Sequence, residues 1–427
     1  MSPLSSFRPE DIRNIVLLGH AGAGKTTLAE AILHRCGAIA RMGSVEAATT
    51  TSDFEPEAKS HGHSTSSTML FATREGREIN MIDTPGSPDF IGQALAALPA
   101  VETALIVVNA AAGIEQNTRR LFHVAGEMAL ARMIVINKID DNLDALPGLV
   151  RELKTAFGPE LHCINLPIPG GADVIDCFDH DAGSAAFGSV AEVHREMLES
   201  AIEIDDEALE RYLAGKSIDL PSLRRCFTRA MIQHHVVPIL FTAARSEVGI
   251  DDLLHVLVEE APSPVSGKPR RLRRGGELIE VAPDPTAPLL AHVFKVTTDP
   301  YLGKLAMIRI LQGKLDGQTP FVCGAEKKAH KAGHVLRVEG RDHPELEAAA
   351  FAGDLVAVAK VEDLHVDQII HDARITDDYA PVLPHYPEPM FSLAIESKNK
   401  TDEIKLSSAL ARLCEEDPTL RSAQNAL

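Results

Sequence analysis

The sequence lacks paired cysteines, a long apolar run and an excess of basic residues. Its six cysteines are widely scattered without a C-x-x-C pair, which fits neither a disulfide framework nor a structural zinc site. No run approaches the roughly 18 apolar residues that a membrane span requires, and the polar N-terminal residues lack the apolar segment of a signal peptide. These absences predict a cytoplasmic protein without a membrane partner.

Basic residues are outnumbered, with 42 Lys and Arg against 61 Asp and Glu and a net charge of -19. This balance argues against a protein that coats nucleic acid non-specifically, because Lys and Arg supply most of that affinity. Two basic stretches remain, residues 268–274 and the group Lys327, Lys328 and Lys331. For each of them, a solvated loop and a contact with an anionic partner are both open.

The length of 427 residues and a hydrophobic content of 45% predict two or three domains. In the first half, short apolar runs alternate with helical patterns, which indicates an α/β domain whose parallel sheet is covered on both faces. These runs are residues 14–18, 79–82, 104–108, 133–136 and 236–241. A stretch rich in Gly, Pro and Asp with little periodicity predicts a small insertion at about residues 165–195.

The second half changes pattern twice. A proline-rich stretch at residues 262–269 interrupts regular structure, and alternating strands at residues 289–296 and 305–310 then predict an all-β unit. After a second proline-rich stretch, a strand is expected at residues 390–395, followed by a helix. The apolar positions of that helix recur at helical spacing and are Ile404, Leu406, Leu410 and Leu413.

A glycine-rich stretch, GHAGAGKTT at residues 19–27, lies between the first apolar run and a helical pattern. Gly19 and Gly24, followed by Lys25 and Thr26, match G-x-x-x-x-G-K-[ST] in the strand-then-helix context of that motif. Its glycines let backbone N–H groups surround the β-phosphate, Lys25 reaches the β- and γ-phosphates, and the Thr26 hydroxyl is placed to ligate Mg²⁺. The stretch therefore predicts a nucleotide phosphate site.

Three further motifs follow strands and predict a guanine nucleotide. Asp83 opens D-T-P-G, which places its carboxylate near Mg²⁺ and the N–H of Gly86 toward the γ-phosphate. In N-K-I-D, Asp140 can accept both the N1 and N2 protons of guanine, while T-A-A is placed to donate a backbone N–H to guanine O6. The predicted nucleotide-contacting residues are Gly19, His20, Ala21, Gly22, Ala23, Gly24, Lys25, Thr26, Thr27, Asp83, Asn137, Lys138, Asp140, Thr242, Ala243 and Ala244.

These motifs, in this order, resemble those of the translational GTPases, and within them elongation factor G and its paralogues. Residues 293–305 (VFKVTTDPYLGKL) and 352–357 (AGDLVA) look like parts of that family's β-barrel second domain. Residues 386–391 (YPEPMF) and 413–418 (LCEEDP) are similar to the start of its ferredoxin-like α+β third domain. The resemblance covers nearly the whole chain.

The resemblance implies three domains. They are a P-loop GTPase domain at residues 1–265, a β-barrel domain at residues 286–373 and an incomplete ferredoxin-like domain at residues 387–427. It also implies a monomeric, Mg²⁺-dependent GTPase that acts on the ribosome. Because the domains that drive translocation in the family are absent from this sequence, we expect no translocation by this chain. We also expect weak hydrolysis without ribosomes.

The chain departs from the family pattern at the proposed active site. The family P-loop typically reads A-H-x-D-A-G-K-T, whereas Gly19 replaces the alanine and Gly22 the aspartate here. Ser87 stands where the family's D-T-P-G-H places the histidine that orients the attacking water, and it lacks the reach and charge of an imidazole. At the position of the family's G-I-T threonine, Ser64 keeps a hydroxyl that would ligate Mg²⁺.

Two functions of different class remain open. The first is a GTP hydrolase in which Lys25, Gly86 and Ser87 form the catalytic group, with Thr26, Ser64 and Asp83 as metal ligands. The second is a non-hydrolysing, GTP-dependent switch or competitor at the ribosomal factor site. The motifs predict nucleotide binding equally for both, and the departures favour a slow enzyme.

Overall fold

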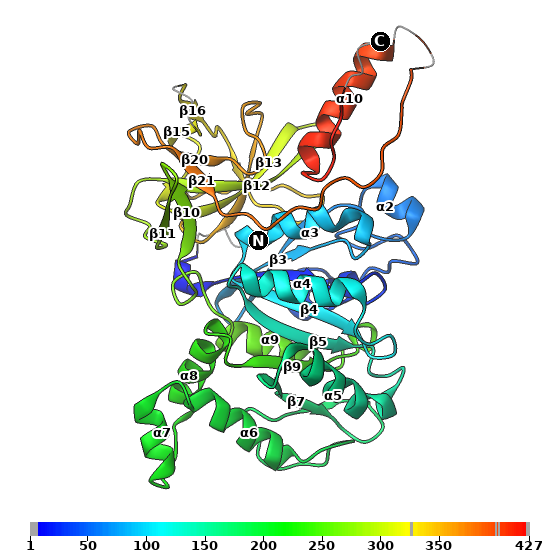
Figure 1. The fold of residues 1–427 in the computed structure, drawn as a ribbon, viewed down its shortest axis with the longest axis vertical. Coiled ribbons are helices and arrows are strands. Elements are labelled where there is room, and N and C mark those ends of the chain that lie inside the picture. Colours follow the sequence, from blue (N-terminus) through cyan, green and yellow to red (C-terminus); the bar gives the residue numbers. More distant parts are fainter. Residues whose placement is uncertain (1–6, 325–327, 398, 400–401, 424–427) are drawn as a thin grey trace.

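The chain forms an α/β unit, an antiparallel β unit and a C-terminal helix, α10 (Glu403–Glu416), as Figure 1 shows. The computed structural model describes residues 7–324, 328–397, 399 and 402–423. Lys327 and the last residues of the expected third domain lie outside the described residues. Within the described part, no helix is long and apolar enough to cross a membrane.

The first unit is built on a seven-stranded sheet of order β2-β3-β1-β4-β5-β9-β6. β2 is antiparallel to β3, and the other pairings are parallel. The strands are β1 (Ile12–Leu18), β2 (Thr68–Arg74), β3 (Arg77–Asp83), β4 (Thr103–Asn109), β5 (Ala131–Asn137), β6 (Leu161–Cys163) and β9 (Val237–Phe241). The predicted α/β class is therefore confirmed, including a strand at each of the five predicted apolar runs.

Helices cover both faces of this sheet because alternate residues of each buried strand point to opposite sides. Val16 and Leu18 pack in one core with α3, α4 and α5, whereas Ile15 and Leu17 pack in a second core with α1, α8 and α9. The helices of this unit are α1 (Lys25–Arg35), α2 (Pro56–His61), α3 (Ile91–Ala97), α4 (Gln116–Glu127), α5 (Leu146–Phe157), α6 (Val190–Ile202), α7 (Asp206–Leu213), α8 (Leu220–Ile232) and α9 (Ile250–Glu259). Residues 165–195 contain the hairpin of β7 (Asn165–Pro167) and β8 (Val174–Asp176) and the start of α6.

The second unit is all-β, as predicted. Its main sheet has the order β16-β15-β20-β12-β13-β19-β17, and its pairings are antiparallel. These strands are β12 (Leu290–Asp299), β13 (Gly303–Gln312), β15 (Pro320–Cys323), β16 (His330–Lys331), β17 (Val335–Leu336), β19 (Leu355–Ala359) and β20 (Ile369–Asp372). Two smaller sheets adjoin it, one of β10 (Arg270–Arg274), β11 (Glu277–Val281) and β21 (Tyr379–Pro381), the other of β14 (Lys314–Leu315) and β18 (Ala350–Phe351).

A buried carboxylate joins the two units. Glu102, directly before β4, accepts hydrogen bonds from Arg309 on β13 at 2.7 and 3.3 Å and from Asn14 on β1 at 2.8 Å. Arg270 on β10 donates a further bond at 2.5 Å. Burial acts to raise the pKa of Glu102, but the charges of Arg309 and Arg270 hold it below its usual range. Such a buried group fixes the relative position of the units because its partners come from both of them.

The expected strand at residues 390–395 is absent. These residues form no strand ladder within the described part of the chain, and Met390, Phe391 and Leu393 are exposed. An apolar run becomes a strand only where a partner strand accepts its hydrogen bonds, and none lies beside this one among the described residues. The helix predicted after it is present as α10, whose last turn contacts the β unit through an ion pair between Glu415 and Lys304 at 2.5 Å.

Candidate nucleotide-binding site

The turn between β1 and α1 requires glycine at both ends of its motif. Gly24 has φ 92° at the N-cap of α1, and a Cβ there would lie 2.4 Å from Nδ2 of Asn137. Gly19 has φ 139°, and a Cβ there would lie 2.3 Å from the carbonyl oxygen of Val107 on β4. Other residues are excluded by both conformation and contact. The turn therefore brings backbone N–H groups and the N-terminus of α1 together, which is an arrangement that suits a phosphate.

Lys25 is enclosed by this turn. Its side chain is buried, and its Nζ donates to the carbonyl oxygens of Gly19 and His20, each at 3.0 Å. Burial lowers the pKa of Lys25 to about 8, although the charges of Asp83 and Asp53 act in the opposite direction. No carboxylate lies within ion-pair distance of this ammonium among the described residues, so a positive charge is held beside the turn where an anionic phosphate fits.

Oxygen donors gather beside Lys25. The Thr26 hydroxyl donates to Oδ2 of Asp83 at 2.8 Å and lies 3.3 Å from the hydroxyl of Ser64. The other carboxylate oxygen of Asp83, Oδ1, is buried without a hydrogen-bond partner in the described part. Burial, helped by the charge of Asp53, raises the pKa of Asp83 to about 6. Hard oxygen ligands and an unsatisfied buried carboxylate oxygen fit a magnesium ion.

The structure thus brings the three predicted metal ligands together. Two neighbours of this site were missed by the motif analysis. The Ser52 hydroxyl donates to Oδ2 of Asp83 at 2.8 Å, and Asp53 is buried, with its pKa raised chiefly by burial. Only the register of the long loop before β2 places these residues against Asp83, and no local pattern encodes that register.

Removing the Thr26 hydroxyl tests the metal assignment. We expect Thr26→Ala to weaken GTP binding in the presence of Mg²⁺ about tenfold, equivalent to about 1.4 kcal/mol. Binding in EDTA should change less, because the hydroxyl then has no ion to ligate. Titration with a fluorescent GTP analogue measures both, and Thr155→Ala on the exposed face of α5 is the control. An equal loss with and without Mg²⁺ would contradict the assignment.

The loops after β5 and β9 meet behind the turn between β1 and α1, residues 19–24, which we call the phosphate turn because its geometry suits a phosphate. Asn137 donates from Nδ2 to the carbonyl of Ala23 at 3.1 Å, while its Oδ1 accepts from the backbone N–H of Ala244 at 3.0 Å. The Thr242 hydroxyl donates to the same oxygen at 3.3 Å. Asp140 is exposed, and within the described residues its carboxylate forms no hydrogen bond or ion pair. One buried asparagine therefore links the phosphate turn and the loops after β5 and β9, and the Asp140 carboxylate is available to a nucleotide base.

Gly86 packs directly on the phosphate turn. A Cβ at this position would lie 2.4 Å from Nζ of Lys25 and 2.6 Å from the backbone nitrogen of Ala21. Its carbonyl accepts a hydrogen bond from Nδ2 of Asn117 at 2.9 Å, which motif analysis also missed. The neighbouring Ser87 hydroxyl is 3.4 Å from Oδ2 of Asp89, a long contact. Ser87 therefore lies beside the turn with its hydroxyl weakly held.

The β unit reaches the loop that carries Ser64. Lys295 on β12 is buried and donates from Nζ to the Ser66 hydroxyl at 2.5 Å and to the carbonyl of Ser67. The adjoining residue, Thr68, begins β2 and pairs with Asp83 across the sheet. The position of the candidate metal ligands is therefore connected to the β unit through a continuous set of contacts.

Sequence models of known families match three parts of the chain. The family described as "Elongation factor Tu GTP binding domain" matches residues 10–263, which include every loop described above. "Elongation factor G domain 2" matches residues 288–371, and "Elongation Factor G, domain III" matches residues 386–426.

Relatives extend this similarity along the chain. An elongation factor G of Thermotoga petrophila is 33% identical over 96% of the chain, and an elongation factor G-like protein of Mycobacterium tuberculosis is 31% identical over 98%. The chain spans 62% of the length of each of these proteins. A crystal structure of a Thermus thermophilus protein superimposes with a TM-score of 0.83 at 32% identity, covering 96% of this chain and 62% of that one.

Proposed function

The chain belongs to the translational GTPases and is elongation factor G-like, and on this premise we propose that it binds GTP with Mg²⁺, hydrolyses it slowly and acts on the ribosome. The observation that supports nucleotide binding most strongly is the convergence of four loops at the carboxyl ends of the parallel strands. These loops follow β1, β3, β5 and β9. Asn137 connects the loops after β1, β5 and β9, and the hydrogen bond from Thr26 to Asp83 connects the end of β3 to them. Ligands of open parallel sheets bind outside the carboxyl ends of the strands.

Each group has a defined task in this proposal. Lys25 exchanges its carbonyl partners for phosphate oxygens, and the N–H of Gly86 donates toward the terminal phosphate. Thr26, Ser64 and Asp83 would hold Mg²⁺, which when bound supplies charge neutralisation at the phosphates. Asp140 accepts the N1 and N2 protons of guanine, while the backbone N–H groups of residues 242–244 face its O6. Phosphoryl transfer then depends on position and electrostatics.

Slow hydrolysis follows from the residue at position 87. The Ser87 side chain is short, and its hydroxyl has one partner among the described residues, Asp89 at 3.4 Å, so it orients an attacking water poorly. A positioned acid or base contributes roughly 100- to 10,000-fold to such a step. The same observation supports a second candidate function, a GTP-dependent switch or competitor at the ribosomal factor site that hydrolyses negligibly. For either function we propose that the chain acts as a monomer.

The guanine assignment is tested at Asp140. The parent should bind GDP and GTP in preference to ATP, because adenine presents an acceptor and no amine to this carboxylate. We expect Asp140→Asn to reduce the preference for GDP over ADP about tenfold, since one charge-assisted hydrogen bond is lost. Calorimetric titration with both nucleotides measures the ratio, and Asp141→Asn is the neighbouring control. Equal affinity of the parent for GTP and ATP would contradict the guanine assignment.

A further inference from the structure

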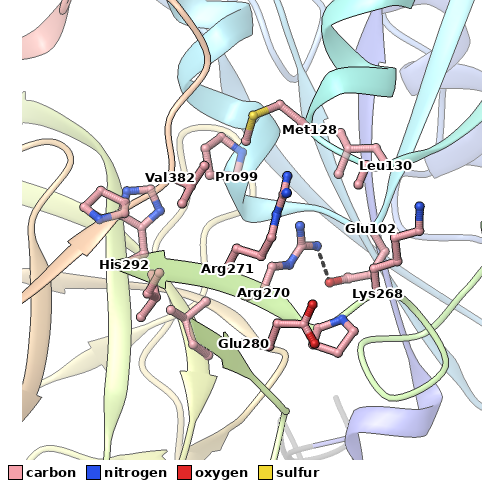
Figure 2. Close-up of a pocket in the computed structure, with 15 residues that line it drawn as sticks. Pro99, Glu102, Met128, Leu130, Lys268, Arg270, Arg271, Glu280, His292 and Val382 are labelled. Carbon is pink, nitrogen blue, oxygen red and sulfur yellow. Dashed lines mark hydrogen bonds and ion pairs between the residues drawn. The ribbon is translucent and has the colours of Figure 1, made fainter. Parts of the chain in front are cut away.

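A cavity of about 240 Å³ lies between the two units (Figure 2). None of the described residues that line it belongs to the nucleotide loops. Its lining includes Glu102 and Leu130, the residues directly before β4 and β5. The nucleotide loops follow the opposite ends of the parallel strands. The cavity is therefore a separate site, at the amino-terminal ends of β4 and β5, where the β unit contacts the first unit.

The lining carries more positive than negative charge. Lys268, Arg270 and Arg271 line it, against Glu102 and Glu280. Glu102 is already occupied by Arg270, Arg309 and Asn14, as described above. Arg271 makes no hydrogen bond or ion pair within the described residues, and Figure 2 shows its side chain extending from β10 toward Pro99 and Met128. Two cations thus remain without a carboxylate partner in the described part, against the single unpaired carboxylate of Glu280.

Neighbouring groups reinforce this positive field. The ammonium of Lys268 lies 3.2 Å from Nε2 of His234, which is not a counter-ion. Burial lowers the pKa of Lys268, and the charges of Arg271 and Arg132 lower it further. A bound anion would relieve this mutual repulsion, because it would favour the charged form of each cation.

A buried imidazole also contributes to the wall. His292 on β12 is 2% exposed, and no hydrogen bond to its ring is formed within the described part of the chain. Its nearest acidic neighbour is Oδ1 of Asp367, at 3.6 Å from Nε2, which is too long for a hydrogen bond. Buried polar groups nearly always have a hydrogen-bond partner. The Nε2 atom of His292 has none in the described part of the chain, so the ring has capacity for a further partner.

The rest of the lining is apolar. It includes Pro99, Met128 and Leu130 from the first unit and Leu311 and Val382 from the chain that follows it. Small-molecule sites combine such apolar walls with a few polar groups that fix orientation. We propose that this cavity binds a small organic monoanion with an apolar body, its carboxylate at Arg271 and Lys268 and its hydrocarbon against Met128 and Leu130. Because both units contribute to the wall, such a ligand holds them in this relative orientation.

Octanoate and octylammonium are matched probes, since they share an alkyl body and differ in charge. Titrated into the full chain loaded with GDP and followed by ligand-observed NMR, octanoate should bind saturably and octylammonium should not. Arg271→Glu should weaken octanoate binding at least tenfold, whereas Arg273→Glu makes the same charge change on the same strand outside the lining and should leave it unchanged. Glu280→Gln should strengthen binding, because it removes the unpaired negative charge.

The proposal is overturned if octanoate binding fails to saturate up to about 10 mM, a concentration that corresponds to very weak affinity. It is equally overturned if octylammonium binds as well, or if Arg271→Glu and Arg273→Glu behave alike. Inorganic phosphate as a third probe tests the apolar body, since binding as tight as that of octanoate would contradict a role for the hydrocarbon. Unchanged GDP affinity in each variant shows that the fold and the nucleotide site are intact.

Discussion

The substitution Lys25→Ala should reduce GTP and GDP affinity on the order of 1,000-fold. A unit charge about 4 Å from a phosphate at a protein surface contributes about 4 kcal/mol, which corresponds to a factor of this size. The parent geometry favours such a loss, because the buried Nζ of Lys25 is held only by the carbonyls of Gly19 and His20 within the described residues and faces no carboxylate there. Equilibrium titration with a fluorescent GDP analogue measures the change.

Two comparisons make this result specific to the site. Lys216→Ala removes an exposed lysine after α7 and should leave affinity unchanged. The circular dichroism spectrum and melting temperature of Lys25→Ala should stay close to those of the parent, because Lys25 forms no ion pair in the part of the chain that the structure describes. Parent-like GDP binding by Lys25→Ala would show that the turn is not a phosphate site.

The substitution Ser87→His should raise GTP turnover with ribosomes by about 100-fold or more, since a positioned acid or base is worth roughly 100- to 10,000-fold. Ser87 is partly exposed beside Gly86, and its hydroxyl has one partner among the described residues, Asp89 at 3.4 Å, so space and solvent access for an imidazole are present. Phosphate release in a rapid-mixing assay, with ribosomes in excess, measures the rate.

Ser87→Ala separates the two possible roles of the serine. If the serine contributes little, Ser87→Ala should hydrolyse GTP within a few-fold of the parent. A fast parent whose activity is lost in Ser87→Ala would mean that the serine itself positions the water. The same outcome would mean that Gly22 and Ser87 belong to a differently organised site.

The sequence predicts the parts of this fold that are encoded locally. The runs that became β1, β3, β4, β5 and β9 are nearly continuous apolar segments, which is how a strand buried on both faces reads. The phosphate turn is equally local, because Gly19 and Gly24 adopt backbone conformations that other residues resist. Where conformation follows from residue type and spacing alone, pattern and structure agree.

The misses have tertiary causes. β2 is not among the predicted runs, because its sequence is less continuously apolar than those of the central strands, and its antiparallel pairing with β3 defines it. The run at residues 390–395 carries apolar residues but has no strand beside it among the described residues. Without a partner for its backbone hydrogen bonds, the run does not form the strand that its pattern predicts. Ser52 and Asp53 from the loop before β2 and Asn117 from the start of α4 join the site through tertiary packing, which no spacing rule anticipates.

Phosphate release from GTP and ATP at equal concentration, with and without ribosomes, tests the central claim most directly. With GTP, we predict slow release by the chain alone and faster release when ribosomes are added. ATP should give no release above background, because Asp140, in the proposed contact, accepts the N1 and N2 protons of guanine, which adenine does not offer. Release from ATP at the rate of GTP would contradict a guanine site built from these four loops, and no release from GTP under any condition would contradict hydrolysis and leave the nucleotide-dependent switch.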